Sequence, residues 1–269
     1  MSFSVKEIIC KSLLRKHKRI DSWFVARYGM NVYRGCVHDC VYCDGRAEKY
    51  QAPSDFAKSI DVKINAPQIL EKELNPEKKR KPMKPGFIMI GGGVSDAYQP
   101  VESRYHITRS LIKIIQKYNY PVHILTKSTL VLNDADLLKE INEEKKAMIS
   151  FSFSSTDDKI SKVFEPGVPL PSERLKTIEK LKKMGFTCGM FLMPVIPFLT
   201  DTPQKINEAL RQAKKEGIDF IIFGGMTLKI GRQRDFFIRT LETYEPNLIQ
   251  KYNKLYAHAN KWGNAPQKF

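Results

Sequence analysis

Short apolar runs alternate with amphipathic segments along most of the chain. Each run is bounded by turn residues and is short enough for a buried strand. We predict six strands on this basis, at residues 30–33, 86–90, 122–125, 147–153, 187–193 and 220–223. Between the strands, apolar residues recur at helical spacing, as in Leu175, Ile178 and Leu181, so each intervening helix is expected to pack on a sheet.

The regular alternation of strand and helix determines the expected fold class. Such an order implies a parallel sheet with right-handed crossovers. Six strand–helix units predict an α/β fold in the form of a partial (β/α)6 TIM-like barrel with a parallel sheet. An open doubly wound sheet is the alternative.

Several residues are expected to mark helix ends. Thr202 and Pro203 fit an N-cap followed by proline at the first helical position. Ser172 is a candidate cap for the helix that precedes this one. Gly185 and Gly217 lie just past two predicted helices, where a left-handed residue is often required.

The chain is expected to fold as one structural domain in three segments. Its 269 residues and 42% hydrophobic content suffice for a single barrel. Residues 1–29 are a basic N-terminal segment, residues 30–229 the partial barrel, and residues 230–269 closing helices. The loop at residues 75–85 is expected to be the most flexible part.

Polar, charged and glycine-rich groups follow the predicted strands at their carboxyl ends. They are the cysteine loop at 36–43, GGGVSD at 91–96, TKS at 126–128, the serines at 152–155, Met-Pro at 193–194 and GGMTLK at 224–229. In parallel barrels, active sites are built at this end of the strands. We therefore expect these loops to form the active site together.

Three of the five cysteines form a C-x3-C-x2-C motif, made by Cys36, Cys40 and Cys43. Secreted disulfide frameworks do not crowd cysteines in this way, and thiolates suit both iron–sulfur clusters and zinc. A structural zinc site needs a fourth ligand, and His38 within the motif offers one, so a Cys3His zinc site is the alternative. In a cluster site, His38 is expected to point away or to fill the loop.

The motif, with the aromatic Tyr42 before its third cysteine, resembles the radical S-adenosylmethionine (SAM) superfamily. Within it, residues 31–43 are similar to the NxYRGCxHxCxYC signature of the spore photoproduct lyase-like branch. Further similarity to that branch lies at residues 93–102, 125–128, 152–154, 165–166 followed by Arg174, and 193–201. The resemblance covers about residues 31–225.

This resemblance implies two cofactors, a 4Fe-4S cluster and SAM. The three cysteines would hold three irons and leave the fourth open for SAM. Reductive cleavage of SAM would give methionine and a 5'-deoxyadenosyl radical, which abstracts hydrogen from a substrate. A reductant such as flavodoxin or ferredoxin is the implied electron donor.

The resemblance also assigns SAM contacts to loops that follow the second and third strands. Gly91, Gly92 and Gly93 occupy the place of a turn that binds the amino group of SAM through backbone carbonyls, although three glycines also suit any tight turn. Ser95 matches the serine of an SD pair that contacts SAM. Lys127 matches a lysine that pairs with the methionine carboxylate.

Four further residues complete the implied SAM site. Ser152 matches a ribose or carboxylate contact, and Ser154 is expected on the same face of the strand because side chains alternate. Tyr42 is expected to stack or hydrogen-bond near the adenine. Met193 is expected to contact the adenine, or else to be an ordinary core methionine.

One position departs from the lyase pattern. Spore photoproduct lyase repairs a thymine dimer in DNA and needs a hydrogen-donating cysteine where this chain has Gly93. Cys188 could face the barrel interior or be an ordinary buried thiol. Tyr98 could relay a radical or simply pack, and Cys10 is read as structural or incidental.

The charge balance bears on the partner. A formal net charge of +16 favours anionic partners, and residues 11–19 and 77–84 are visibly basic. These stretches are either a nucleic-acid contact surface or a solvated surface. Since no apolar run approaches a membrane span and residues 1–11 lack a secretory signal, we expect a cytoplasmic monomer with no membrane partner.

Three functions remain open at this point. The first is a radical SAM enzyme that acts on nucleic acid, by photoproduct lyase-like repair or by base modification. The second is a radical SAM enzyme that acts on a metabolite or a peptide. The third is a non-catalytic iron–sulfur or zinc protein that binds nucleic acid.

Overall fold

The computed structural model describes residues 3–50, 56–78 and 83–266. Its main sheet has seven strands in the order β10-β9-β8-β7-β6-β3-β2. They are β2 (Arg15–Asp21), β3 (Ala26–Met30), β6 (Ile88–Ile90), β7 (Val122–Thr126), β8 (Ala147–Phe153), β9 (Thr187–Val195) and β10 (Phe220–Gly225). All neighbours are parallel except β2, which is antiparallel to β3.

A second, smaller sheet is built from the N-terminal part of the chain. It has the order β1-β5-β4, with β1 (Ser4–Ile8) parallel to β5 (Ser59–Lys63) and β4 (Tyr33–Arg34) antiparallel to it. The first 29 residues therefore supply strands to both sheets. The division of the chain at residues 29 and 229 stays a prediction.

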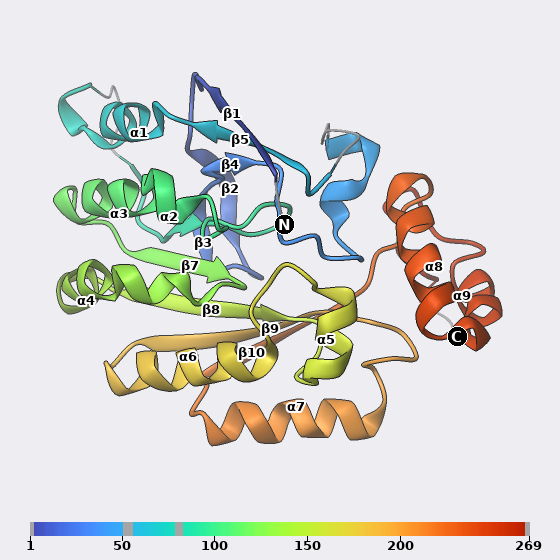
Figure 1. Ribbon diagram of the computed structural model, residues 1–269. Coiled ribbons are helices and arrows are strands. Elements are labelled where there is room, and N and C mark those ends of the chain that lie inside the picture. Colours follow the sequence, from blue (N-terminus) through green and yellow to red (C-terminus); the bar gives the residue numbers. More distant parts are fainter. Residues whose placement is uncertain (1–2, 51–55, 79–82, 267–269) are drawn as a thin grey trace.

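Helices follow the strands of the main sheet. The α-helices are α1 (Ala66–Leu74), α2 (Glu102–Tyr105), α3 (Ile107–Lys117), α4 (Ala135–Glu144), α5 (Asp158–Phe164), α6 (Pro171–Lys183), α7 (Pro203–Lys215), α8 (Arg232–Tyr244) and α9 (Ile249–Leu255). Short 3-10 helices are η1 (Asp44–Arg46), η2 (Glu48–Tyr50), η3 (Pro76–Lys78), η4 (Thr129–Asp134) and η5 (Pro246–Leu248). Figure 1 shows α8 and α9 apart from the other helices, on the side toward which β7 points.

The sheet and its helices form a half-barrel, which confirms the predicted partial TIM-like architecture. Six parallel strands, β3 and β6 to β10, match the six predicted units. The first of them is β3 (Ala26–Met30), where the sequence predicts a strand at 30–33. This strand begins earlier because Ala26, Tyr28 and Met30 alternate toward the core, with half-buried residues between them.

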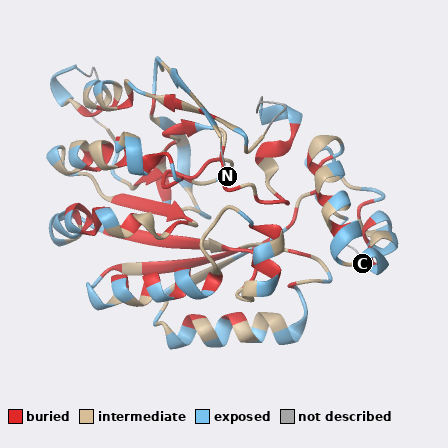
Figure 2. Cartoon of the chain, viewed as in Figure 1, coloured by how far each residue is buried: buried red, intermediate tan, exposed pale blue. Residues whose placement is uncertain are grey.

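The core lies between the sheet and the helices that cover it. In α6, Leu175, Ile178 and Leu181 are buried, as their helical spacing predicts. Figure 2 shows the central strands buried, while the outer faces of α4, α6 and α7 are exposed. Of the described helices, none is long and apolar enough to cross a membrane.

Most predicted helix ends are confirmed. Thr202 Oγ1 accepts a hydrogen bond from the Lys205 amide at 3.3 Å, as an N-cap does. Gly185 and Gly217 have φ angles of +86° and +66°, as left-handed C-terminal residues do. The prediction for Ser172 is wrong.

Helix α6 begins one residue before Ser172, at Pro171. The Ser172 hydroxyl donates instead to Asp158 Oδ2 at 2.6 Å, so it links α6 to α5 and caps neither. Of the predicted flexible loop at 75–85 and the basic stretch within it, residues 79–82 lie outside the described part of the chain.

Candidate cofactor site at the carboxyl ends of the strands

A cavity of about 340 Å³ lies at the carboxyl ends of the main-sheet strands. Cys36, Cys40 and Cys43 line it together with residues from strand β9 and from the loops after β6, β7 and β10. Of the other residues predicted for SAM, those that line the cavity are Tyr42, Gly92, Gly93, Ser95, Lys127, Ser152 and Met193. The fold thus brings ten predicted residues to one cavity, although the first, Cys36, and the last, Met193, lie 157 positions apart in the chain.

Backbone hydrogen bonds hold the cysteine loop against the last residue of α5 and the segment that follows it. The Val41 amide donates to the Phe164 carbonyl at 2.9 Å, and the Gly167 amide donates to the His38 carbonyl at 3.0 Å. A Cβ atom at Gly167 would lie 2.6 Å from the His38 carbonyl oxygen, so only glycine permits this approach. The loop is therefore fixed by contacts that do not use the cysteine side chains.

Side chains hold the loop from two other directions. Gln99 Oε1 accepts from the Val37 amide at 2.7 Å, while Gln99 Nε2 donates to the Asp96 carbonyl at 2.9 Å. On the opposite side, Arg46 Nε donates to the Cys40 carbonyl at 3.1 Å, and its guanidinium lies 3.6 Å from the centroid of the Phe236 ring. The cysteine loop is thereby tied both to the turn after β6 and to α8.

The three thiols suit an iron–sulfur ligand set. Cys36 and Cys40 are buried and Cys43 is half-buried, and none of the three is in a disulfide. Burial raises the pKa of all three thiols, to about 12 for Cys40. Binding of iron would supply the positive charge that thiolates need in this environment. Within the described residues, no three His, Cys, Asp or Glu side chains are placed to hold a single metal ion.

His38 lies at the wall of the cavity and is buried within the cysteine loop. Its Nδ1 is 3.6 Å from Asp96 Oδ2, and burial lowers the pKa of the imidazole. Burial of His38 within the loop agrees with the second of the two expectations, that the histidine fills the loop. The imidazole of His38 therefore faces the Asp96 carboxylate in the loop after β6.

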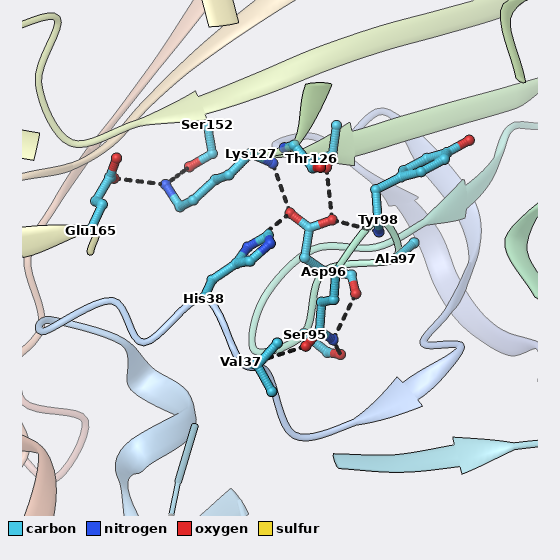
Figure 3. Close-up of polar contacts among 12 residues, drawn as sticks. Val37, His38, Ser95, Asp96, Ala97, Tyr98, Thr126, Lys127, Ser152 and Glu165 are labelled. Atoms are coloured by element: carbon cyan, nitrogen blue, oxygen red, sulfur yellow. Dashed lines mark hydrogen bonds and ion pairs between the residues drawn. The ribbon is translucent and has the colours of Figure 1, made fainter. Parts of the chain in front are cut away.

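Asp96 organises the turn after β6 (Figure 3). Its Oδ1 accepts from Thr126 Oγ1 at 2.7 Å and from the Tyr98 amide at 2.8 Å. Its Oδ2 accepts from the Lys127 amide at 2.7 Å. One carboxylate thus fixes the ends of β6 and β7 relative to each other, and it sets the position from which the Lys127 side chain enters the cavity.

Glu165 organises the opposite wall. It is fully buried and accepts hydrogen bonds from the Tyr42 hydroxyl, from Lys127 Nζ at 3.0 Å and from the Ser154 amide at 3.2 Å. Arg174, also fully buried, forms an ion pair with its Oε2. Burial alone would raise the pKa of this carboxyl, but the charges of Arg174 and Lys127 outweigh it and hold the pKa well below its usual range.

Lys127 keeps bonding capacity for a ligand. Its Nζ donates to Ser152 Oγ at 2.9 Å and to Glu165 Oε1, which uses two of three N–H groups (Figure 3). Since Arg174 also neutralises Glu165, two cations face a single carboxylate in this cluster. The cluster of Lys127, Glu165 and Arg174 therefore carries one more positive than negative charge.

The glycine turn combines a structural requirement with an open surface. Gly91 has φ of +87°, and a Cβ atom there would lie 2.5 Å from the Leu125 carbonyl oxygen, so this glycine supports the turn without lining the cavity. Gly93 lines the cavity, and a Cβ atom there would have no heavy atom within 4 Å. Ser95 lines the cavity as well, and its Oγ donates to the Gly35 carbonyl at 2.9 Å.

The remaining predicted residues differ in their placement. Ser152 Oγ donates to the Met193 carbonyl at 3.1 Å, and both residues line the cavity. Ser154 is fully buried and is not among the described residues that line the cavity. Ser154 lies one residue past the end of β8, and its amide donates to Glu165 Oε1.

Tyr98 and Cys188, for which the sequence left a radical role or simple packing open, are both buried in the core. The Tyr98 hydroxyl donates to Asp134 Oδ2 at 2.9 Å, and the side chain is buried behind the cavity. Cys188 is fully buried in the main hydrophobic core. Neither is among the described residues that line the cavity.

A hydrogen-bond network around Asp44 was not predicted from the sequence. Asp44, which follows the last cysteine, accepts from Lys229 Nζ at 2.6 Å, from Gln233 Nε2 at 3.0 Å and from the Thr227 hydroxyl. Gln233 also donates to the Tyr42 carbonyl at 2.9 Å. No local pattern in the sequence links these residues, because about 185 positions separate the two halves of the network.

Comparison with known proteins identifies the family. The model of the radical SAM superfamily matches residues 30–202. The chain belongs to the radical SAM superfamily. Membership implies SAM and an iron–sulfur cluster as cofactors and supports an enzymatic activity.

Relatives at the sequence level are proteins without an assigned function. An uncharacterized protein of Mycobacterium tuberculosis is 30% identical over 254 residues, which cover 93% of this chain and 73% of the relative. An uncharacterized protein of Methanocaldococcus jannaschii is 30% identical over 223 residues, which cover 82% of this chain and 79% of that protein.

Among solved structures, this radical SAM chain is similar to spore photoproduct lyase with bound S-adenosylmethionine and dinucleoside spore photoproduct. The TM-score is 0.60 at 20% identity, and the match covers 90% of this chain and 66% of the lyase. The chain thus spans about two thirds of the lyase's length. The fold resemblance to the spore photoproduct lyase-like branch is confirmed.

Proposed function

We propose that this protein holds a 4Fe-4S cluster on Cys36, Cys40 and Cys43 and reductively cleaves SAM to form a 5'-deoxyadenosyl radical. The observation that carries the proposal is the convergence of three unpaired thiols and Lys127 on one cavity. Three ligands leave one iron of such a cluster open, which a closed structural metal site would not. When bound, the cluster and SAM supply the electron transfer and the radical chemistry.

The residues of the chain position SAM and exclude water. The free N–H of Lys127 would bind the methionine carboxylate, because the Glu165 cluster carries one more positive than negative charge. Backbone carbonyls at Gly92 and Gly93 would accept from the amino group. Phe191 and Met193 give the cavity an apolar wall against which the adenine can pack.

For the substrate, we propose a nucleic acid. The support is a net charge of +16, which favours an anionic partner. Gly93 supplies no thiol at the cavity, so the proposal covers modification or repair of a nucleic acid in general and is not restricted to the lyase reaction. A metabolite or a peptide is the alternative substrate class.

Deuterium transfer tests this proposal. The anaerobically reconstituted protein is supplied with SAM, a reductant such as flavodoxin, and deuterium-labelled oligonucleotides. Deuterium in the recovered 5'-deoxyadenosine is the expected result, because the radical takes hydrogen from its substrate. Unlabelled 5'-deoxyadenosine together with transfer from a labelled pool of metabolites or peptides would overturn the substrate class and leave SAM cleavage intact.

A further inference from the structure

The hairpin of β2 and β3 carries a row of cations for which the described part of the chain offers no acidic partner. Arg15, Lys16, Lys18 and Arg19 in β2 are all exposed. Among the described residues, no carboxylate lies within 4.0 Å of any of the four. Since β2 is the last strand of the main sheet, its outer edge has no partner strand among the described residues either.

The turn at the end of this hairpin is held in place. Asp21 Oδ1 accepts from the amides of Trp23 and Phe24 at 2.9 and 3.1 Å. The Phe24 carbonyl accepts from His123 Nδ1 on β7 at 2.7 Å. The turn is thereby attached to the interior of the half-barrel and is not a loose loop.

The turn connects the cation row to the cofactor cavity. Phe24 lines the cavity, and its ring stacks on Phe191 of β9, with centroids 5.7 Å apart and planes at 7°. Trp23, the residue before it, is 49% exposed. From Arg15 to Arg19 the strand spans about 13 Å at roughly 3.3 Å per residue. One hairpin thus presents cations, then an exposed indole, then a ring in the cavity wall.

We propose that the β2–β3 hairpin binds a single strand of nucleic acid and leads one base toward the cavity. This inference rests on the proposed function, whose substrate class it specifies. The exposed arginines and lysines would bind phosphates, and Trp23 would stack on a base, which is how sequence-tolerant single-strand sites are built. The proposal commits to a single strand because a base in a duplex would first have to be flipped out of the stack to reach the cavity.

Charged residues on an edge strand also have a simpler use, since they prevent edge-to-edge pairing of sheets. That use requires charge alone. It does not require an exposed tryptophan beside a residue of the cavity wall. The effects of the two residue types on binding therefore separate the two interpretations.

Fluorescence anisotropy with a labelled 12-nucleotide single-stranded deoxyoligonucleotide measures the binding. The first variant is K16A/K18A/R19A, and its matched control is K176A/K180A/K214A, which removes three exposed charges from α6 and α7. We expect the hairpin variant to lower the slope of log affinity against log salt by about 2, since each single-strand phosphate contact contributes roughly 0.7. The control is expected to keep the wild-type slope.

The second variant tests the aromatic contact. Trp23→Ala is expected to weaken binding about tenfold with an unchanged salt slope, because stacking on a base is not an ionic contact. Trp23→Phe is expected to retain most of the affinity, and Trp262→Ala, which removes a similarly exposed tryptophan, is expected to retain all of it. Circular dichroism checks that every variant is folded.

Several outcomes would overturn the inference. They are equal slopes for the two triple variants, unchanged affinity of Trp23→Ala, or tighter binding of a duplex than of a single strand. A fourth is a hairpin variant that binds the oligonucleotide normally but takes up electrons from flavodoxin more slowly, which would assign the hairpin to an acidic protein partner.

The anisotropy measurement is independent of SAM. Cleavage of SAM by the wild-type protein is assayed in parallel without an oligonucleotide. If the wild type binds the oligonucleotide through the hairpin but does not cleave SAM, the proposed function fails and the hairpin inference stands. If it cleaves SAM but fails the binding test, only the hairpin inference is lost.

Discussion

Lys127 Nζ lies 3.0 Å from Glu165 Oε1, at the wall of the cavity that also carries the three cysteines. The pair joins the end of β7 to the segment after α5. Glu165 has a second cation in Arg174, so loss of the lysine leaves the buried carboxylate paired. This arrangement allows the role of Lys127 to be tested without unfolding the site.

Lys127→Ala is expected to weaken SAM binding about tenfold or more and to leave the iron content unchanged. The reason is the loss of a charged hydrogen bond to the methionine carboxylate, which contributes about 1.5–3 kcal/mol. Calorimetric titration of the reconstituted protein with SAM measures the change. Lys162→Ala on the exposed face of α5 is the control, and equal affinities of the two variants would show that Lys127 does not contact SAM.

Cys40→Ala is expected to abolish cluster binding, because two remaining thiolates hold a cubane poorly. Iron and sulfide are quantified after anaerobic reconstitution. The visible absorption from sulfur-to-iron charge transfer is recorded on the same samples. Cys10→Ala, which removes a half-buried thiol outside the cavity, is expected to bind iron as the wild type does. A full complement of iron in Cys40→Ala would contradict the ligand assignment.

Arg174→Met is expected to lower the free energy of unfolding by about 3 kcal/mol, because it removes one partner of a fully buried ion pair. Urea denaturation of the cluster-free protein measures the loss. Lys183→Met breaks an exposed pair with Glu179 and is expected to cost less than about 1 kcal/mol. A similar small loss in both variants would show that Glu165 does not depend on Arg174.

The stability of the fold is expected to fall in mild acid because of His123. Burial lowers the pKa of this imidazole from 6.5 to about 4. The unfolded chain therefore binds the proton more readily, so the contribution is fully present above pH 6.5 and declines as the pH falls toward 4, by about 3 kcal/mol in total. In the neutral imidazole, Nε2 carries no proton and accepts a hydrogen bond from Ser150 Oγ at 2.8 Å.

Thermal denaturation between pH 4 and pH 7 measures this dependence. His123→Gln is expected to flatten the decline, and His258→Gln, which replaces an exposed histidine, is expected to keep it. A decline of the same steepness in both variants would assign the acid sensitivity to other groups.

The sequence predicted the parts of the fold that follow a regular pattern. The strands β7, β8, β9 and β10 lie where apolar runs predict them. In β7 and β8 the run is continuous because a central parallel strand is buried on both faces. The strand β2 escaped prediction because its cations leave both faces exposed and remove the period of two. Strand β5 was also not predicted. Its buried residues Ile60 and Val62 alternate with polar ones, but the strand has only 5 residues, too few for a clear pattern.

The candidate site was predictable where chemistry is concentrated in one segment. The cysteine motif and Lys127 are recognisable by residue type and position, and the fold gathers them at one cavity. Glu165 and Arg174 lie in segments that resemble the branch, yet nothing in the sequence shows that they meet the lysine. Asp44 and Gln233 gave no signal because their contact depends on the tertiary fold.

Formation of 5'-deoxyadenosine tests the central claim most directly. The reconstituted protein is incubated with SAM and dithionite under anaerobic conditions, and 5'-deoxyadenosine and methionine are quantified against Cys40→Ala and Cys10→Ala. We predict equal amounts of the two products from the wild type and from Cys10→Ala, and none from Cys40→Ala. A fully loaded wild-type cluster that yields no 5'-deoxyadenosine, or equal yields from wild type and Cys40→Ala, would contradict the account.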